Sequence, residues 1–294
     1  MKFRTEYEPR QAEAMLDPDS GIVLLGSCFS DSIGGRMRDC QWEASVNTCG
    51  VLYNPASIAN ILDLALELNP AILTDAILGS LSFRDELCET WLMDSSATAG
   101  TPEATELKIR SALVNLQNAL STAQALIVTF GTAWIYELAD RIGYVVSNCH
   151  KYPASSFRRR RLTVEEIVMR WKGLAESLRC RYPDLRIIFT VSPIRHLKDG
   201  MEGNARSKAV LLLACEEICN QLPYAEYFPA FEILYDDLRD YRFYADDLIH
   251  PSRQAVEYIW TKFCDRYLTP ASRQLIARRE KALKATLHRP IISI

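Results

Sequence analysis

The stretch IVLLGSCF (residues 22–29) decides the fold class of this 294-residue chain. Four consecutive apolar residues that end at Gly26 are typical of a strand buried on both faces of a parallel sheet. A helix is expected to begin just after Cys28. The turn at residues 26–28 therefore lies at the carboxyl end of a strand, where α/β proteins bind their ligands.

Apolar runs and helical patterns then alternate along the chain. Asn54 can cap a helix that has Pro55 at its first position, and Thr163 with Glu166 forms the capping box of another. Further helices are predicted at residues 107–120 and 204–221 and after the HPS motif at 250–252. Strands are predicted at residues 125–130, 186–192 and 224–228, with a hairpin arm at 142–147. This alternation predicts an α/β fold, a three-layer α/β/α sandwich with a mostly parallel sheet.

The chain is expected to form one α/β domain over residues 1–268, with a C-terminal helical tail over residues 269–294 that packs on the domain. A basic RNA-binding tail is the alternative. The packed helix is favoured because Leu275, Ile276 and Leu283 offer it an apolar contact. The basic residues of the tail are Arg273, Arg278, Arg279, Lys281, Lys284 and Arg289.

The composition excludes several classes of partner. There are 34 Lys and Arg against 37 Asp and Glu, a net charge of −3, so no binding to nucleic acid or to an anionic membrane is expected. No apolar run approaches the ~20 residues of a membrane span, and the start of the sequence has no signal-peptide pattern. The nine cysteines, irregularly spaced, indicate free thiols in a reducing compartment, which predicts a cytoplasmic location.

Two local patterns carry groups suited to nucleophilic catalysis. Cys28 lies on a strand-to-helix turn, where the helix N-terminus favours an anion and is expected to lower the pKa of the thiol. Asp247 precedes His250 by three residues, so its carboxylate can orient the imidazole and leave the other ring nitrogen as a base. Taken alone, the first pattern also fits a buried, inert cysteine and the second a helix-entry histidine.

The order of these two patterns resembles that of SGNH/GDSL hydrolases, whose first block reads Gly-Asp-Ser and whose last block reads Asp-x-x-His. In this chain the first block is Gly26-Ser27-Cys28, so a cysteine stands in the nucleophile's position. Longer motifs over about residues 20–260 resemble the GSCFA family, which occurs mainly in bacteria. These motifs are LLGSCFSDSIG (24–34), NTCGVLYNPASIA (47–59), FGTAWIYE (130–137), NCHKYP (148–153), SPIRHLKDG (192–200) with Asn204 and Ser207-Lys208-Ala209, and DLIHPS (247–252). The resemblance implies an SGNH-hydrolase-like fold.

The resemblance also implies roles for single residues. Cys28 would be the nucleophile, His250 the base, Asp247 the orienting group, and Gly50 a backbone donor to the oxyanion. The third block departs from the superfamily's Gly-x-Asn, because residues 131–133 read Gly-Thr-Ala and lack the asparagine that donates to the oxyanion. Loss of one such donor costs about 10²–10³ in rate. The candidates to replace it are Thr132, Asn54 and Asn148.

Other polar side chains near strand ends allow several interpretations. Ser27 is the alternative nucleophile, with Cys28 then only packing. His150, Arg195 and His196 can bind a substrate carboxylate, a phosphate or sugar hydroxyls. The two histidines can also replace His250 as the base, or the three residues can brace the site through hydrogen bonds.

Further residues are interpreted as structural. The aromatic side chains Tyr53, Trp134 and Tyr136 are expected in the core, with stacking on a sugar as the alternative. The basic run at residues 158–161 is expected to be an exposed loop, with an anion site as the alternative. Cys215 and Cys219, one helical turn apart, are interpreted as core thiols rather than metal ligands because no second ligand pair accompanies them.

These features together predict a hydrolase or acyltransferase that acts on an ester through a Cys-His-Asp triad and a thioester intermediate. The substrate is expected to be a small-molecule ester or an acylated carbohydrate, the latter implied by the resemblance alone. A non-catalytic binding or scaffold protein with a degraded oxyanion site is the alternative, and a cysteine peptidase is a third hypothesis. No cofactor and no metal are predicted, and the oligomeric state stays open.

Overall fold

The computed structural model describes residues 4–287, with side chains up to residue 285. Within this range the centre is a five-stranded sheet in the order β10-β9-β5-β1-β2, and each neighbouring pair is parallel. The strands are β1 (Gly21–Gly26), β2 (Ala44–Val46), β5 (Ala123–Phe130), β9 (Arg186–Val191) and β10 (Ala225–Tyr227). The predicted parallel sheet is confirmed, and four of its strands coincide with the apolar runs.

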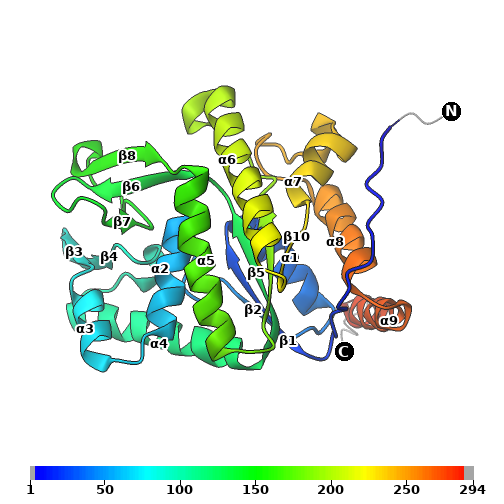
Figure 1. Cartoon of the computed structure of the whole chain (residues 1–294), viewed down its shortest axis with the longest axis horizontal. Coiled ribbons are helices and arrows are strands. Elements are labelled where there is room, and N and C mark those ends of the chain that lie inside the picture. The colour runs from blue at the N-terminus through cyan, green and yellow to red at the C-terminus, as the bar shows by residue number, and fades with distance from the viewer. Residues whose placement is uncertain (1–3, 288–294) are drawn as a thin grey trace, which may run out of the picture.

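Helices cover both faces of this sheet (Figure 1). One layer holds α2 (Pro55–Leu66), α4 (Pro102–Thr122), α5 (Val164–Arg181) and α6 (Gly200–Gln221); the other holds α1 (Cys28–Asp39), α8 (Arg253–Tyr267) and α9 (Pro270–Leu287). In β1, Val23 and Leu25 pack into the apolar cluster of the first layer, and Ile22 and Leu24 into that of the second. A strand covered on both faces needs an unbroken apolar run, so the α/β/α prediction is confirmed.

Two small antiparallel sheets lie beside the parallel sheet (Figure 1). One is the hairpin of β3 (Leu81–Arg84) and β4 (Leu87–Thr90); the other places β6 (Trp134–Leu138) between β7 (Val145–Val146) and β8 (Phe157–Arg161). The predicted hairpin arm contains β7. The prediction of an exposed loop at residues 158–161 is wrong: these residues form β8, because the segment pairs with β6 and Arg160 binds Glu137 at 2.9 Å.

Short elements complete the described chain. They are α3 (Pro70–Leu78), α7 (Ala230–Glu232), a π-helical turn (Ile233–Leu238) and 3₁₀ turns at Ser95–Ala97, Ala154–Ser156, Leu197–Asp199 and Tyr241–Phe243. In α9, Ile276 is buried in the cluster that α1 and α8 share, and Glu280 binds Arg36 at 2.8 Å. Residues 288–294 of the expected tail, Arg289 among them, lie outside the described residues. Between residues 4 and 287, no helix has the length and apolar character needed to cross a membrane.

The strand order reverses at β1, with β2 on one side and β5 on the other. In open α/β sheets the crevice at such a switch point is where ligands bind, outside the carboxyl ends of the strands. Here the segments that follow β1 and β5, residues 27–28 and 131–132, border that crevice. The fold therefore brings the turn that carries Cys28 to the edge where a site is expected.

Close approach of these two strand ends requires a glycine. Gly26 has φ +140°, and a Cβ on it would lie 2.2 Å from the carbonyl oxygen of Thr129. Without that Cβ, the Ser27 N–H donates to the same carbonyl oxygen at 3.2 Å. The turn before Cys28 is thereby attached directly to β5.

Adjacent glycines in α1 give a matched test of this packing. A Cβ on Gly34 would lie 2.3 Å from Val46 Cγ2 on β2, whereas a Cβ on Gly35 would meet no atom within 4 Å. We expect Gly34→Ala to lower the free energy of unfolding by about 1–3 kcal/mol through overpacking. We expect Gly35→Ala to raise it by about 0.5–1 kcal/mol, because alanine is the better helix former. Urea denaturation measures both, and effects of the same sign would contradict the packing of α1 on β2.

Candidate active site

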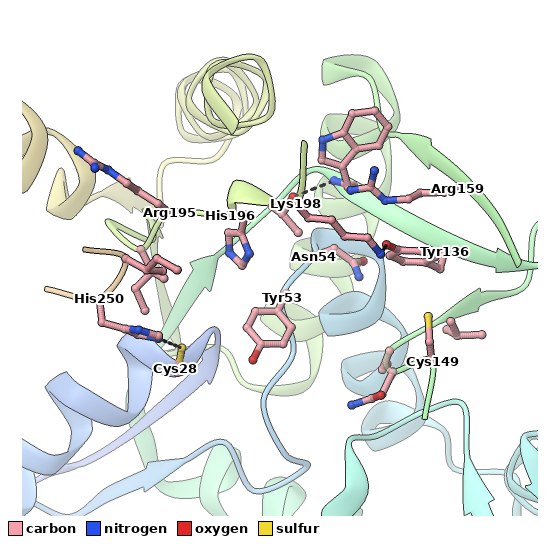
Figure 2. Close-up of a pocket in the computed structure, with 17 residues that line it drawn as sticks. Cys28, Tyr53, Asn54, Tyr136, Cys149, Arg159, Arg195, His196, Lys198 and His250 are labelled. Atoms are coloured by element: carbon pink, nitrogen blue, oxygen red, sulfur yellow. Dashed lines mark hydrogen bonds between the residues drawn. The ribbon is translucent and has the colours of Figure 1, made fainter. Parts of the chain in front are cut away.

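Cys28 is the first residue of α1 and faces the cavity at the switch point (Figure 2). Its Sγ lies 3.7 Å from Nε2 of His250, a hydrogen-bonding distance for sulfur. Ser27 is the N-cap of the helix: it is fully buried, and its Oγ accepts from the Phe29 N–H at 3.4 Å. The structure thus turns Cys28 toward the cavity and Ser27 away from it.

Asp247 forms two hydrogen bonds with His250 and one with Ile249. Its Oδ2 lies 2.6 Å from His250 Nδ1, and its Oδ1 accepts from the backbone N–H groups of Ile249 and His250, each at 2.9 Å. The two backbone bonds, together with the bond from the ring, lower the pKa of Asp247 to about 2. An ionised carboxylate on Nδ1 favours the tautomer with a proton there, which leaves Nε2 free to accept the thiol proton.

Burial raises the pKa of the Cys28 thiol, and the Asp31 carboxylate raises it further. The backbone N–H groups of Cys28 and Phe29 at the start of the helix lower the pKa, as expected, but the desolvation that disfavours a thiolate outweighs them and the charge of Lys208. The thiol form of Cys28 is therefore favoured, and His250 Nε2 lies where it can take the proton.

The donors to an oxyanion differ from those expected. As the first N–H of α1, the Cys28 N–H has no partner within the helix. Gly50 is not presented in this way, because its N–H already donates to the Asn47 carbonyl oxygen at 2.8 Å. Gly50 has φ +78° and lies against the Asp94 side chain. A Cβ on Gly50 would be 2.3 Å from Asp94 Oδ1. Gly50 is used to make a tight turn, which corrects the role expected for it.

The three candidate replacement donors all line the cavity, but two are committed elsewhere. Asn54 caps α2, with Oδ1 accepting from Ser57 N–H at 2.8 Å and Nδ2 donating to Ser57 Oγ at 2.9 Å. Thr132 Oγ1 accepts from Trp134 N–H and lies 3.1 Å from Ser207 Oγ. Asn148 uses only its Oδ1, which accepts from His150 N–H at 2.8 Å. Its amide N–H group is the donor left for a ligand.

The other two histidines differ from His250. His150 is buried away from the cavity, with Nε2 2.7 Å from the Thr90 carbonyl oxygen, so it braces the structure. His196 lines the cavity, and burial, with Lys208 nearby, lowers its pKa to about 4. Its Nε2 is buried and has no hydrogen-bond partner among the described residues. Neither has the carboxylate geometry of the Asp247–His250 pair.

The cavity has a volume of about 410 Å³. Its second wall comes from the three-stranded sheet, which contributes Trp134 and Tyr136, and Tyr53 lines the cavity from the segment before α2 (Figure 2). The expectation that these three side chains lie in the core is therefore wrong. The lining residues are Cys28, Tyr53, Asn54, Thr132, Trp134, Tyr136, Val146, Ser147, Asn148, Cys149, Arg159, Ile194, Arg195, His196, Lys198, Ile249 and His250. The sequence indicated Arg159 only within the basic run at residues 158–161, for which an anion site was the alternative, and Lys198 only within the SPIRHLKDG motif. Neither was assigned to this cavity, because their neighbours across it are distant in the chain.

Lys208 is the residue beneath the cavity whose role the sequence did not indicate. It is 2% exposed, and its Nζ donates to the carbonyl oxygens of Gly131 at 2.7 Å and Ser192 at 2.6 Å. Burial lowers its pKa to about 7. The signal in the sequence was its place in Ser207-Lys208-Ala209, one of the segments that resemble the GSCFA family, but the resemblance gave the residue no role.

The described residues contain no cluster of side chains suited to binding a metal ion. Between residues 4 and 285, no group of three or more His, Cys, Asp or Glu side chains is arranged to hold an ion. All nine cysteines lie in this range and are unpaired. Cys215 is buried and Cys219 half-buried beside the same apolar cluster, in agreement with their interpretation as packing thiols.

Comparisons with known proteins identify one family. The GSCFA family model matches residues 21–263. A search among curated proteins found no match.

Solved structures with a similar chain trace include three bacterial proteins. A candidate platelet activating factor from Streptococcus pneumoniae has 10% identity and a TM-score of 0.42, covering 84% of this chain and 83% of its own. A family two carbohydrate esterase from Clostridium thermocellum, in complex with cellohexaose, has 12% identity and a TM-score of 0.36, covering 95% and 67%. An acetyl xylan esterase from Butyrivibrio proteoclasticus has 8% identity and a TM-score of 0.39, covering 92% and 66%. Similarity at this level carries no information on activity.

The raised thiol pKa gives a direct test of the site. Alkylation of Cys28 by iodoacetamide is expected to be slow at pH 7 and to rise through a midpoint above the ordinary range of a thiol. Asp31→Asn should move that midpoint down, because the Asp31 carboxylate disfavours the thiolate. Mass spectrometry of the Cys28 peptide, with Cys28→Ser as control, follows the reaction. A midpoint at or below the ~8.5 of a free thiol would show that burial does not dominate.

Proposed function

The chain belongs to the GSCFA family, and from the geometry of its cavity we propose that it is an esterase or acyltransferase. Cys28 is the nucleophile, His250 the general base and Asp247 the group that orients the base. The observation that carries this proposal is the continuous path from Asp247 Oδ2 to His250 Nδ1, 2.6 Å, and from Nε2 to Cys28 Sγ, 3.7 Å. Contacts of this kind often tighten only when substrate binds.

The first step acylates the cysteine. His250 Nε2 takes the proton of the Cys28 thiol while Sγ attacks the carbonyl carbon of the ester. The tetrahedral intermediate collapses, the carbon–oxygen bond of the leaving group breaks, and the imidazolium returns the proton to the departing alcohol. Asp247 stabilises the imidazolium that forms between these two proton transfers. The product is a thioester on Cys28 and a free alcohol.

The second step releases the acyl group. His250 removes a proton from water or from an acceptor hydroxyl, whose oxygen attacks the thioester carbonyl. Cys28 leaves as a thiolate and is reprotonated by the imidazolium. Attack by water makes the protein an esterase, and attack by another hydroxyl makes it an acyltransferase. A thioester suits both outcomes, because it is reactive toward alcohols as well as water.

The negative charge on the tetrahedral intermediate needs donors at the end of the turn. The Cys28 N–H at the start of α1 is one, and the dipole of that 12-residue helix favours an anion beside it. With one donor assigned, fewer than in a complete oxyanion hole, the expected rate is lower than that of enzymes with the full set.

Two observations favour Cys28 over Ser27 as the nucleophile. Cys28 is partly exposed and lines the cavity, whereas Ser27 is 0% exposed and uses its hydroxyl to cap α1. The sulfur is also the atom next to His250 Nε2. A reducing cytoplasm, as predicted from the free thiols, would keep that sulfur in its reactive form.

The lining of the cavity supports a carbohydrate ester as substrate. Tyr53, Trp134 and Tyr136 line a space of about 410 Å³, enough for a small acylated sugar, although Arg159 covers one face of the Trp134 ring. Rings of this kind pack against the apolar faces of sugars, and their polar atoms bind hydroxyls. A small-molecule ester with an aromatic alcohol would use the same rings.

A non-catalytic binding protein is the second candidate function. The observation in its favour is the oxyanion region, where Gly50 N–H is engaged and no asparagine follows Gly131. In that case the cavity would bind an ester without cleaving it. The next two experiments separate the two functions.

Removal of the nucleophile is the decisive test. With 4-nitrophenyl acetate and acetylated sugars as substrates, Cys28→Ala is expected to lower kcat/KM by at least about 10³-fold and His250→Ala by about 10²–10⁴-fold. Ser27→Ala is the matched control: it removes an N-cap and costs about 0.5–2 kcal/mol of stability, with little loss of activity. Activity that survives in Cys28→Ala and is lost in Ser27→Ala would reverse the assignment. No activity above these variants in the wild type would favour the binding protein.

The charge of Asp247 can be separated from its hydrogen bonds. Asp247→Asn keeps an oxygen for the N–H groups of Ile249 and His250 but removes the carboxylate that stabilises the imidazolium. We expect kcat to fall about 10–10³-fold, with a far smaller change in KM. The fall in kcat should be smaller than in a fully buried triad, because the Asp247 side chain is 46% exposed. The neighbour Asp246→Asn is the control. An unchanged kcat in Asp247→Asn would remove the orienting role.

A further inference from the structure

The charges that line the cavity are unlike those of the chain as a whole. The chain has more acids than bases, yet the 17 lining residues include three permanent cations, Arg159, Arg195 and Lys198, and no carboxylate. Arg195 stacks on the rings of Tyr244 and Tyr241, at 4.1 and 5.2 Å, and its side chain runs away from Cys28 (Figure 2). The two remaining cations lie on the wall opposite Cys28.

Lys198 projects from the 3₁₀ turn Leu197–Asp199 toward the three-stranded sheet (Figure 2). Its Nζ donates to the Tyr136 hydroxyl at 2.5 Å and lies 4.9 Å from the centre of that ring. No carboxylate of the described residues forms an ion pair with it. The ammonium at this end of the cavity therefore has no ion-pair partner, although its charge contributes to the lowered pKa of the neighbouring Asp199.

The nearby carboxylate, Asp199, is already committed. Both of its oxygens accept from the guanidinium of Arg159, and this bond lowers the pKa of Asp199. Arg159 in turn lies over the Trp134 ring, 4.3 Å from its centre. Because this pair is neutral as a unit, the net charge of the region is the positive charge of Lys198.

The polar groups around Lys198 are donors. The Tyr136 hydroxyl accepts from Lys198, so its own proton is available to a ligand. Asn148 has its oxygen occupied by His150 N–H, which leaves its amide protons. A sugar hydroxyl needs an acceptor as well as a donor, whereas a carboxylate or phosphate needs donors and a positive charge alone. Only the second kind of group matches this set.

We propose that Lys198, Tyr136 and Asn148 form a subsite for an anionic group, a carboxylate or a phosphate, carried by the substrate. This inference rests on the proposed function, because it specifies which esters the protein acts on. They are esters with a negative charge at the end remote from the reacting carbonyl. Tyr53 lies between this subsite and the Cys28–His250 pair (Figure 2). The substrate then spans the cavity, with its acyl ester at Cys28 and its anion at Lys198.

The test measures how fast Cys149 beside the subsite is alkylated, so it does not depend on the reactivity of Cys28. Cys149 lines the same end of the cavity, and Lys198 and Arg159 are the charges that lower its pKa against the effect of burial. Its alkylation by iodoacetamide at pH 8.5 is followed by mass spectrometry, with inorganic phosphate or acetate replacing chloride at constant ionic strength. We expect saturable protection of at least about threefold in the wild type. Lys198→Met should abolish it, and Lys172→Met, which removes an exposed lysine outside the cavity, should keep it.

Two further readouts keep the test decisive. The rate ratio of iodoacetate to iodoacetamide at Cys149 should fall about two- to fivefold in Lys198→Met, because the charged reagent loses its attraction. Calorimetric titration with inorganic phosphate should show binding that weakens at least about fivefold in the same variant, whatever the reactivity of the thiol. Protection by phosphate alone assigns a phosphoryl group, and protection by both anions assigns a carboxylate-sized site.

The outcomes separate this inference from the proposed function. The anion subsite would be overturned if Lys198→Met and the wild type gave the same three results: the protection of Cys149 by anions, the rate ratio of iodoacetate to iodoacetamide, and the affinity for phosphate. Absence of Cys28-dependent turnover with every ester would instead overturn the proposed function, and the anion site would then be read as part of a binding protein. Equal kcat/KM for 4-nitrophenyl acetate and the monoester 4-nitrophenyl glutarate would contradict a preference for anionic esters.

Discussion

One buried amino group links the two strand ends on which the cavity is built. Lys208 reaches from α6 under the sheet edge and donates to the carbonyl oxygens of Gly131 and Ser192, which follow β5 and β9. Peptide oxygens left unpaired at this depth would cost several kcal/mol, and the amino group of Lys208 satisfies both. Ser207, one residue earlier, also binds the turn after β5. Its Oγ accepts from the Ala133 N–H at 2.8 Å and lies 3.1 Å from Thr132 Oγ1. The floor of the site is therefore fixed by α6 together with the strand pairing, in which the Ser192 N–H donates to the Phe130 carbonyl oxygen at 2.8 Å.

The features that the sequence could predict are those encoded locally. An apolar run before Gly26 predicts a buried strand, and a capping pattern predicts a helix start, because both depend on neighbours within a few residues. The pairing of Cys28 with Asp247 and His250 was predictable only from the order of two motifs in a parallel sheet. Their contact over more than 200 residues follows from the fold.

The features that the sequence could not predict depend on distant parts of the chain. The arginines of β8 look like an exposed loop until β6 supplies a pairing strand and Asp199 a counter-ion. The N–H of Gly50 is consumed by a turn that no spacing reveals. The thiol of Cys28 is subject to two opposed effects, helix field and burial, and only the surroundings in three dimensions decide which is larger.

The wall that faces Cys28 belongs to a sheet of modest cohesion. The apolar cluster between the two small sheets holds three buried side chains, Trp91, Leu138 and Val146, in the described part of the chain, whereas Ile135 of β6 packs into the main cluster of the domain. Segments with so small a core open locally at a lower cost than the body of a domain. If this part of the wall opened in that way, the cavity would widen while the parallel sheet and the turn that carries Cys28 stayed intact. Amide hydrogens of β7 and β8 would then exchange with solvent sooner than those of β1 and β5.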